Sequence, residues 1–460
     1  MPGLPDAKLD IVRGLVASAP DKVVDGLRAA LTTAGGDTAL AGVRRVVEAE
    51  VAERILRNQV LEPIAPLFGR SAAAGLSFAA PALPLLWRGL CAIAPAEVEK
   101  AALALETYEP GLTTSEPFDL LVEKLLDEID IGEQPQIVSA LKLVEDAQPN
   151  GVLALRACLT IAPVVRRATM KLPQWIIRTS QERAAAVRIA YRDACRTGDD
   201  LGPYFFEMLA AQLTEPWAIL RIVSAVMDRP AEAYLAGSEL AVFATRLMDT
   251  IDLGLASVAK FDLDGGRASG EAAAEAVETL TRQIAELENA IELSRDGGWG
   301  GRIQKQKQGL ASIVEARLRE LPKIQGALFP SQKVRSARGV ISEPRLDLPP
   351  DNGRLERARG LLAFVEGVRA SANYGGFAST RARMIEEAEQ ALDQYVEDVL
   401  AAVREGEARD RDNARLLLDA AAEFAGQIRE PRAGEIVRRR TTAAFAALPS
   451  GRRGGALALD

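Results

Sequence analysis

The sequence predicts an all-α protein, organised as a multi-helix bundle or an irregular α-solenoid. Alanine, the strongest helix former, supplies 79 of the 460 residues. Apolar residues recur at helical spacing along most of the chain, and no run shows convincing strand alternation. A fixed repeat of about 30–45 residues is not found, so the sequence does not predict a regular helical-repeat array.

An N-terminal multi-helix domain is predicted for residues 1–261. Proline, glycine and asparagine turns separate its helices, as in Pro110-Gly111 and Asn150-Gly151. The predicted helices span residues 6–18, 20–33, 37–60, 81–93, 95–107, 116–130, 134–147, 150–168, 173–196, 203–213, 216–228 and 237–259.

An antiparallel helical hairpin is predicted for residues 270–326. Its first helix carries a coiled-coil-like seam of apolar residues spaced three and four apart, and its second helix continues the pattern. The seam residues are Val277, Leu280, Ile284, Leu287 and Ile291, followed by Ile303, Leu310, Val314, Leu318 and Leu321. The glycine-rich segment 296–301 between them lacks the strand and the Lys-Ser/Thr pair of a phosphate-binding P-loop, so it is predicted to be a turn. Trp299 in this turn either packs on a neighbouring domain or is an exposed anchor for a partner.

A linker is predicted for residues 331–353, where periodicity is lost and prolines gather. An acidic C-terminal helical domain, residues 354–448, follows with helices at 354–372, 376–405 and 410–429. From Glu386 to Glu430 there are 13 acidic and 5 basic residues, a net charge of −8.

A basic flexible tail, residues 449–460, is predicted to end the chain. From Pro431 onward 6 basic residues oppose 2 acidic ones, and the basic residues include Arg438, Arg439 and Arg440. These arginines are candidates for contact with nucleic acid, an anionic membrane or an acidic protein surface. The alternative is that the arginine-rich end folds back on the acidic segment before it.

Composition excludes several classes of site. The chain has no histidine, which removes Ser-His-Asp and Cys-His catalysis, imidazole-bound zinc and His-ligated haem. Three widely spaced cysteines predict neither a disulfide framework nor a thiolate metal site, and each is interpreted as a small buried hydrophobe. The excess of 45 Arg over 11 Lys is attributed to GC-rich, bacterial coding bias.

A cytoplasmic location is expected. Charged residues interrupt the apolar pattern of the first fifteen residues, so no signal peptide is predicted. No stretch approaches the roughly 18 uncharged apolar residues of a membrane span.

Two helices carry charged faces. On helix 116–130 the residues Asp119, Glu123, Asp127 and Asp130 form a stripe that is interpreted as a solvated face. On helix 173–196 the residues Arg178, Arg188 and Arg192 share one face and are candidates for binding an anionic partner. Arg183 falls on the predicted buried face, where a guanidinium requires an internal ion pair or a bound anion.

No cofactor or metal is predicted. Asp262 and Asp264 resemble the start of a calcium loop, but the residues that follow do not fit it. The leading hypothesis is a non-enzymatic helical interaction protein: an adaptor, scaffold or regulatory subunit that binds other proteins and is capable of homo-oligomerisation. One alternative is an all-α enzyme that uses carboxylates, with or without a divalent metal. A second is nucleic-acid or anionic-membrane association through the arginine-rich end.

Overall fold

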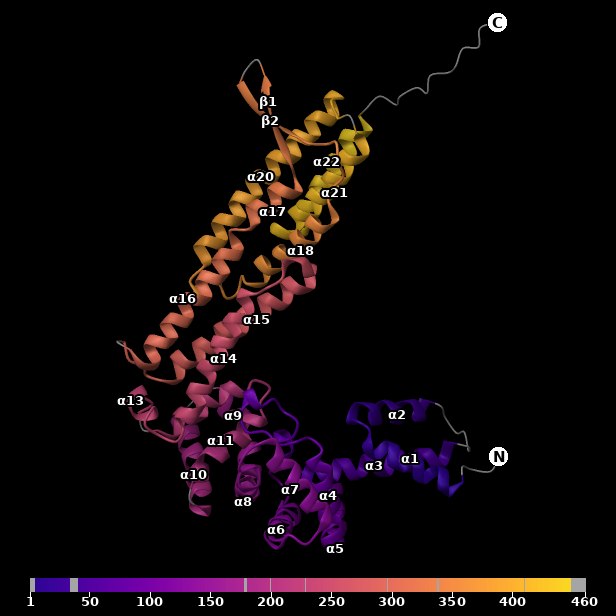
Figure 1. The fold of residues 1–460 in the computed structure, drawn as a ribbon, viewed down its shortest axis with the longest axis vertical. Coiled ribbons are helices and arrows are strands. Elements are labelled where there is room, and N and C mark those ends of the chain that lie inside the picture. The colour runs from indigo at the N-terminus through magenta and orange to yellow at the C-terminus, as the bar shows by residue number, and fades with distance from the viewer. Residues whose placement is uncertain are drawn as a thin grey trace. The chain divides into compact units, whose positions relative to one another are not determined.

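The computed structural model describes residues 5–33, 40–177, 180–198, 200–227, 229–295, 297–336, 339–408 and 410–447. It confirms the all-α fold, with 78% helix and 3% strand (Figure 1). Among the described helices, none combines the length and the apolar character that crossing a membrane requires.

The chain divides into two compact units. Unit 1 comprises Met1–Pro230 and Tyr234–Phe243, and unit 2 comprises Ala231–Ala233 and Ala244–Asp460. This division differs from the predicted boundary at residue 261, because most of helix α14 (Ala241–Ala259) belongs to unit 2. The predicted hairpin and C-terminal domain also share one unit.

Unit 1 is an irregular array of short helices around a buried central helix, α8. Helices α6, α7, α10 and α11 all pack against α8. Eleven of its residues are buried, among them Cys158 and Arg166. The helices of unit 1 are α1 (Asp6–Ser18), α2 (Asp21–Thr33), α3 (Ala41–Val60), α4 (Ala82–Ile93), α5 (Pro95–Glu106), α6 (Glu116–Ile131), α7 (Pro135–Ala147), α8 (Gly151–Thr169), α9 (Leu172–Ile177), α10 (Gln181–Thr197), α11 (Gly202–Ala211) and α12 (Leu220–Val226), with 3₁₀ turns η2 (Ala65–Leu67), η3 (Ala72–Ala74) and η4 (Pro216–Ile219).

Unit 2 is built from longer helices and one β-hairpin. Its elements after α14 are η5 (Leu263–Gly265), α15 (Gly266–Ala290), α16 (Gly298–Leu318), α17 (Leu321–Leu328), β1 (Ser331–Ser336), β2 (Gly339–Pro344), α18 (Asn352–Gly367), α19 (Ala372–Gly375), α20 (Ala378–Glu405), α21 (Arg411–Ile428) and α22 (Pro431–Ala446). Short helix α13 (Glu232–Leu235) lies at the division between the units.

Helix α15 packs mainly against α18, and its contact with the sequence-adjacent α16 is smaller (Figure 1). Small residues permit this close crossing. A Cβ atom on Gly270 would overlap the carbonyl oxygen of Gly360, and one on Gly367 would overlap the Cβ of Ala274. The apolar seam of α15 is buried as predicted from Val277 to Leu287, but α18, far away in sequence, covers much of this helix.

The predicted linker 331–353 contains structure that the sequence pattern does not indicate. Strands β1 and β2 pair antiparallel, with Ser331 opposite Pro344 and Val334 opposite Ile341. The strands were not predicted because they carry few apolar residues, so the alternation that marks a half-buried strand is weak.

Two further predictions about helices are corrected. The predicted helix 173–196 is two helices, α9 and α10. Ser180 is the N-cap of α10, and its side-chain oxygen accepts a hydrogen bond from the backbone N–H of Arg183. The arginine-rich segment after Pro431 is the helix α22, which packs against α21 and α20. Residues 449–460, the predicted flexible tail, lie outside the described part of the chain.

Candidate functional site

Two adjoining hollows in unit 2 form the candidate site, and we refer to them together as the acidic groove. They follow helix α20 beside the β1–β2 hairpin. Figure 1 shows this hairpin starting from the end of α17. The hollows share Ser342 and Asp398, and this shared wall joins them. The backbone N–H of Arg345 donates to the carbonyl of Pro330 at 2.9 Å and closes the base of the hairpin.

The inner hollow has a volume of about 460 Å³. Helix α17 and the following residues, both strands and α20 supply its walls. It is lined by Pro322, Gln325, Gly326, Phe329, Ser331, Ser342, Glu387, Ala391, Gln394, Tyr395 and Asp398. Its described lining residues include two carboxylates and no basic residue.

Two lining side chains of the inner hollow are almost completely buried: Gln325 is 4% exposed and Tyr395 is 5% exposed. Gln325 Nε2 donates to the carbonyl of Ala388 at 2.8 Å, and the Tyr395 ring packs on Phe329 with centroids 5.1 Å apart. Gln325 Oε1 and Tyr395 Oη have no hydrogen-bond partner within the described residues. Burial raises the pKa of Tyr395, so its hydroxyl stays protonated at neutral pH.

The outer hollow has a volume of about 630 Å³ and lies toward the C-terminal end of α20. It is lined by Gln332, Ser342, Glu343, Pro344, Arg345, Leu346, Asp347, Asp398, Ala401, Ala402, Glu405 and Glu407. Among the described residues, Arg345 is the only basic one that lines it, and it forms an ion pair with Asp347 at 2.8 Å.

Among the described lining residues of the acidic groove there are therefore six acidic side chains and one basic side chain. The acids are Glu343, Asp347, Glu387, Asp398, Glu405 and Glu407. Across the described part of the chain, no ion pair is found for Glu343, Asp398, Glu405 or Glu407. Glu405 is the last residue of α20 and Glu407 follows its C-cap Gly406. Because the C-terminal end of a helix carries partial negative charge, these carboxylates add to it rather than offset it.

The predicted partner residues lie elsewhere. Trp299 is half-buried in the first turn of α16, and its backbone N–H donates to Glu232 Oε1 at 2.7 Å. The other oxygen of Glu232 accepts the N–H groups of Ser294 at 2.8 Å and Gly300 at 3.2 Å. The glycine-rich segment is therefore the start of a helix capped by an internal carboxylate. Side chains at Gly298 and Gly300 would collide with Glu232 and Ser294 respectively.

Of the three arginines predicted to share a face of helix 173–196, Arg188 and Arg192 lie one turn apart on α10. Arg188 is half-buried and its Nε donates to the carbonyl of Ala225 at 3.0 Å, whereas Arg192 is exposed. Arg183 lies in the first turn of α10 and is half-buried rather than buried. Arg178 lies outside the described residues.

The arginine triplet of α22 is directed partly toward acidic α20. Arg440 forms an ion pair with Glu397 of α20 and is half-buried. Arg439 is exposed and lies 3.7 Å from Glu435 in its own helix, and Arg438 is also exposed.

A buried charge cluster in unit 1 was missed from the sequence. Arg166 is 2% exposed and donates to Asp119 Oδ1 at 2.8 Å and to the carbonyls of Gln59 and Val60 at 2.6 Å. Asp119 is therefore not on a solvated face. Burial raises the pKa of Glu62, while the charge of Arg166, 3.7 Å away, opposes the rise. The cluster caps the C-terminal end of α3 and serves the fold.

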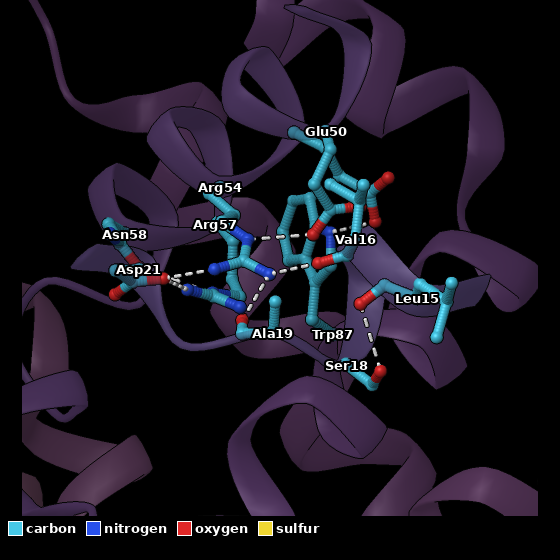
Figure 2. Close-up of polar contacts among 11 residues, drawn as sticks. Leu15, Val16, Ser18, Ala19, Asp21, Glu50, Arg54, Arg57, Asn58 and Trp87 are labelled. Atoms are coloured by element: carbon cyan, nitrogen blue, oxygen red, sulfur yellow. Dashed lines mark hydrogen bonds and ion pairs between the residues drawn. The ribbon is translucent and has the colours of Figure 1, made fainter. Parts of the chain in front are cut away.

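A hollow of about 550 Å³ in unit 1 contains further arginines, shown in Figure 2. Arg54 in its wall donates to Glu50 at 2.7 Å, to Asp21 at 2.5 Å and to the carbonyls of Val16 and Ala19 at 2.9 and 2.8 Å. These contacts hold the α1–α2 turn on α3. Because Arg54 is engaged by the chain's own acceptors, this hollow is a weaker candidate than the acidic groove.

Thiol chemistry and metal binding receive no support from the described residues. All three cysteines are free; Cys158 is buried as expected, but Cys91 is half-buried and Cys195 is exposed. Burial raises the pKa of Cys91 to about 11 and also raises the pKa values of Cys158 and Cys195, which disfavours a thiolate nucleophile. No cluster of three or more Cys, Asp or Glu side chains suited to a metal ion is found among them.

The signal for the acidic groove was partly present in the sequence. The net charge of −8 between Glu386 and Glu430 includes four of its acids, whereas Glu343 and Asp347 come from the segment predicted to be a linker. Comparison of the chain with protein-family models, with curated proteins and with solved structures finds no match.

Proposed function

We propose that this chain is an interaction protein, of the adaptor, scaffold or regulatory-subunit kind, that binds a basic segment of a partner protein in the acidic groove. The observation that supports this proposal is that the described residues lining the groove include six acidic side chains and one basic side chain. Complementary charge of this kind accelerates encounter and selects partners of opposite sign.

The carboxylates at the end of α20 strengthen the argument. Negative charge at a helix C-terminus costs stability, about 0.3–1 kcal/mol for each charge near the last turn. Glu405 and Glu407 have no compensating ion pair among the described residues. A bound cation would relieve this repulsion, so the arrangement favours a basic ligand over a neutral one.

The length of the groove favours a chain segment. Its lining residues on and just after α20 run from Glu387 to Glu407, about 30 Å at 1.5 Å per residue. An extended segment of about nine residues covers that length. Nucleic acid is disfavoured here because its phosphates would face the same carboxylates.

The experiment measures binding of a fluorescein-labelled oligolysine peptide to the full chain by fluorescence anisotropy. The test variant carries Asp398→Asn and Glu405→Gln. We expect a loss of about 1–2 kcal/mol, roughly five- to thirtyfold in Kd, because each removed pair contributes up to about 1 kcal/mol. Binding of the unaltered chain weakens as salt rises, since exposed charges are screened.

The matched control variant carries Glu386→Gln and Asp419→Asn. It changes the net charge equally, but these exposed residues do not line the acidic groove. Equal losses in both variants would mean that the peptide senses only overall charge, and the proposal would fail. Labelled DNA that binds more tightly than the peptide would also contradict it and would favour the arginine-rich end as the functional surface.

A further inference from the structure

The chain continues past Ala447, the last described residue, with a short basic sequence. Arg452 and Arg453 are its only charged residues before Asp460. Glycines precede and follow the pair, and glycine places few limits on the backbone conformation. We refer to Arg452 and Arg453 as the tail pair.

Helix α22, which leads to the tail pair, lies beside α20 in unit 2 (Figure 1). The two helices run in the same direction. Arg429, just before α22, pairs with Asp393 of α20, whereas Arg440, farther along, pairs with Glu397. The C-terminal end of α22 therefore points toward the C-terminal end of α20, where the outer hollow lies.

A contact in the last turn of α22 supports this placement. The ring of Phe445 lies against Arg415 of α21, with the guanidinium carbon 6.0 Å from the ring centroid. Helix α21 begins at Arg411, four residues after Glu407 of the outer hollow. The described chain thus ends close to the acidic end of α20.

The tail pair is within reach of the outer hollow. Arg452 and Arg453 are five and six residues beyond Ala447, which corresponds to about 17–20 Å of extended chain. The axes of packed helices are about 8–10 Å apart, so this length suffices to pass from α22 across α20.

We propose that the tail pair occupies the outer hollow and competes there with the basic segment of the partner. This inference rests on the proposed function, because it makes the acidic groove a site that the chain itself covers until a partner displaces the tail pair. A ligand on a short tether is present at an effective concentration in the millimolar range, so even two arginines of weak intrinsic affinity compete.

The walls of the outer hollow match two neighbouring arginines. Its carboxylates without an ion pair among the described residues are Glu343, Asp398, Glu405 and Glu407. Glu343 belongs to β2, whereas Asp398 and Glu405 belong to α20. Successive side chains of an extended segment point to opposite sides, so one arginine is directed to each wall. A guanidinium forms strong, charge-assisted hydrogen bonds with a carboxylate.

The first experiment removes the competitor from the full chain. With Arg452→Gln and Arg453→Gln combined, labelled oligolysine should bind about two- to tenfold more tightly at low salt, because no tethered arginines have to be displaced. Fluorescence anisotropy measures the Kd. In a chain that also carries Asp398→Asn and Glu405→Gln, the same two substitutions should have no effect.

The matched control variant carries Arg438→Gln and Arg439→Gln. It removes the same charge from exposed arginines of α22 that do not line the groove. Equal tightening in both variants would mean that oligolysine senses only overall charge, and the competition by the tail pair would be refuted.

A second experiment detects the contact without any peptide. Arg453→Lys supplies an amine that a carbodiimide joins to a neighbouring carboxylate as an amide, the carbodiimide taking up the water that is lost. Mass spectrometry should find residue 453 linked to acids of the outer hollow, with a yield that does not depend on protein concentration. Links only to acids elsewhere, no link, or a yield that rises with protein concentration would each overturn the proposal.

The two experiments separate this inference from the proposed function. If oligolysine binds and the tail-pair variant has the Kd of the unaltered chain, the tail pair is not a competitor while the proposed function stands. If oligolysine binds neither form at low salt, the proposed function fails, and the competition with a partner that rests on it fails too. The cross-link then reports only whether the tail pair contacts the outer hollow.

Discussion

At the scale of a single residue, the buried Arg166 shows how one charged side chain joins three helices of this fold. Its guanidinium satisfies two carbonyls at the end of α3 and the carboxylate of Asp119 on α6, while its own helix is α8. Arg54 likewise donates to the carbonyls of Val16 and Ala19 at the end of α1 and to the carboxylate of Asp21 at the start of α2 (Figure 2). Helix ends leave carbonyls without intrahelical partners, and in short-helix arrays these ends are numerous. Arginine, with five donors in a planar fork, can satisfy several of them at once.

Arg166→Met should therefore lower the free energy of unfolding by about 3–5 kcal/mol, because it removes a buried guanidinium and leaves the half-buried carboxylate of Asp119 and two carbonyls without their donor. The matched control is Arg156→Met on the same helix, whose exposed ion pair with Asp130 contributes at most about 1 kcal/mol. Urea denaturation measures both values. Equal effects of the two substitutions would contradict a stabilising role for the buried cluster.

Glu62 should make stability depend on pH. Burial raises its pKa in the folded protein above the value in the unfolded chain. Because the folded state then holds the proton more tightly, the contribution of Glu62 is fully present at acidic pH and is lost as pH rises through the folded pKa. Glu62→Gln should be more stable than the unaltered chain at neutral pH and no more stable in acid.

Urea denaturation at acidic and neutral pH checks this expectation, with the exposed Glu99→Gln as control. A loss of stability on Glu62→Gln at neutral pH would mean that attraction to Arg166 outweighs burial.

At the scale of elements, the crossing of α15 and α18 depends on glycine. Gly270→Ala would place a methyl group on the carbonyl of Gly360, a backbone atom that cannot move aside without shifting a helix. We expect a destabilisation of about 1–3 kcal/mol or more, measured by denaturant unfolding. Gly309→Ala on α16 is the matched control, since its new Cβ would meet only Leu255 Cδ1 at 3.8 Å. That substitution should gain up to about 1 kcal/mol of helix stability. If Gly270→Ala were equally benign, the helices would not be as close as described.

The glycine-rich segment at the start of α16 shows how a sequence feature typical of turns can mislead. Four glycines around Trp299 predict a turn, and the sequence does not show that Glu232, more than sixty residues earlier, caps the helix that follows. The β-hairpin was missed for a related reason. Its strands are stabilised by pairing with each other, and their side chains are too polar to give a periodic signal.

At the scale of the whole molecule, net charge is less informative than its distribution. The net charge of −8 is modest for 460 residues, yet the described residues that line the acidic groove include six carboxylates and one arginine. Some arginines that a sequence-based hypothesis assigns to external partners are used internally instead, as Arg188 and Arg440 are. The tests of the acidic groove therefore compare variants of equal net charge.

The sequence by itself determined the all-α class, most helix positions and the acidic character of the C-terminal segment. These properties are local: alanine content, helical spacing and turn residues act within a few turns of chain. Only the tertiary structure decided which carboxylates share a groove, which arginines are buried, and that Gln325 and Tyr395 line one hollow. Those facts depend on contacts between residues distant in sequence, and a single sequence contains no periodicity that records them.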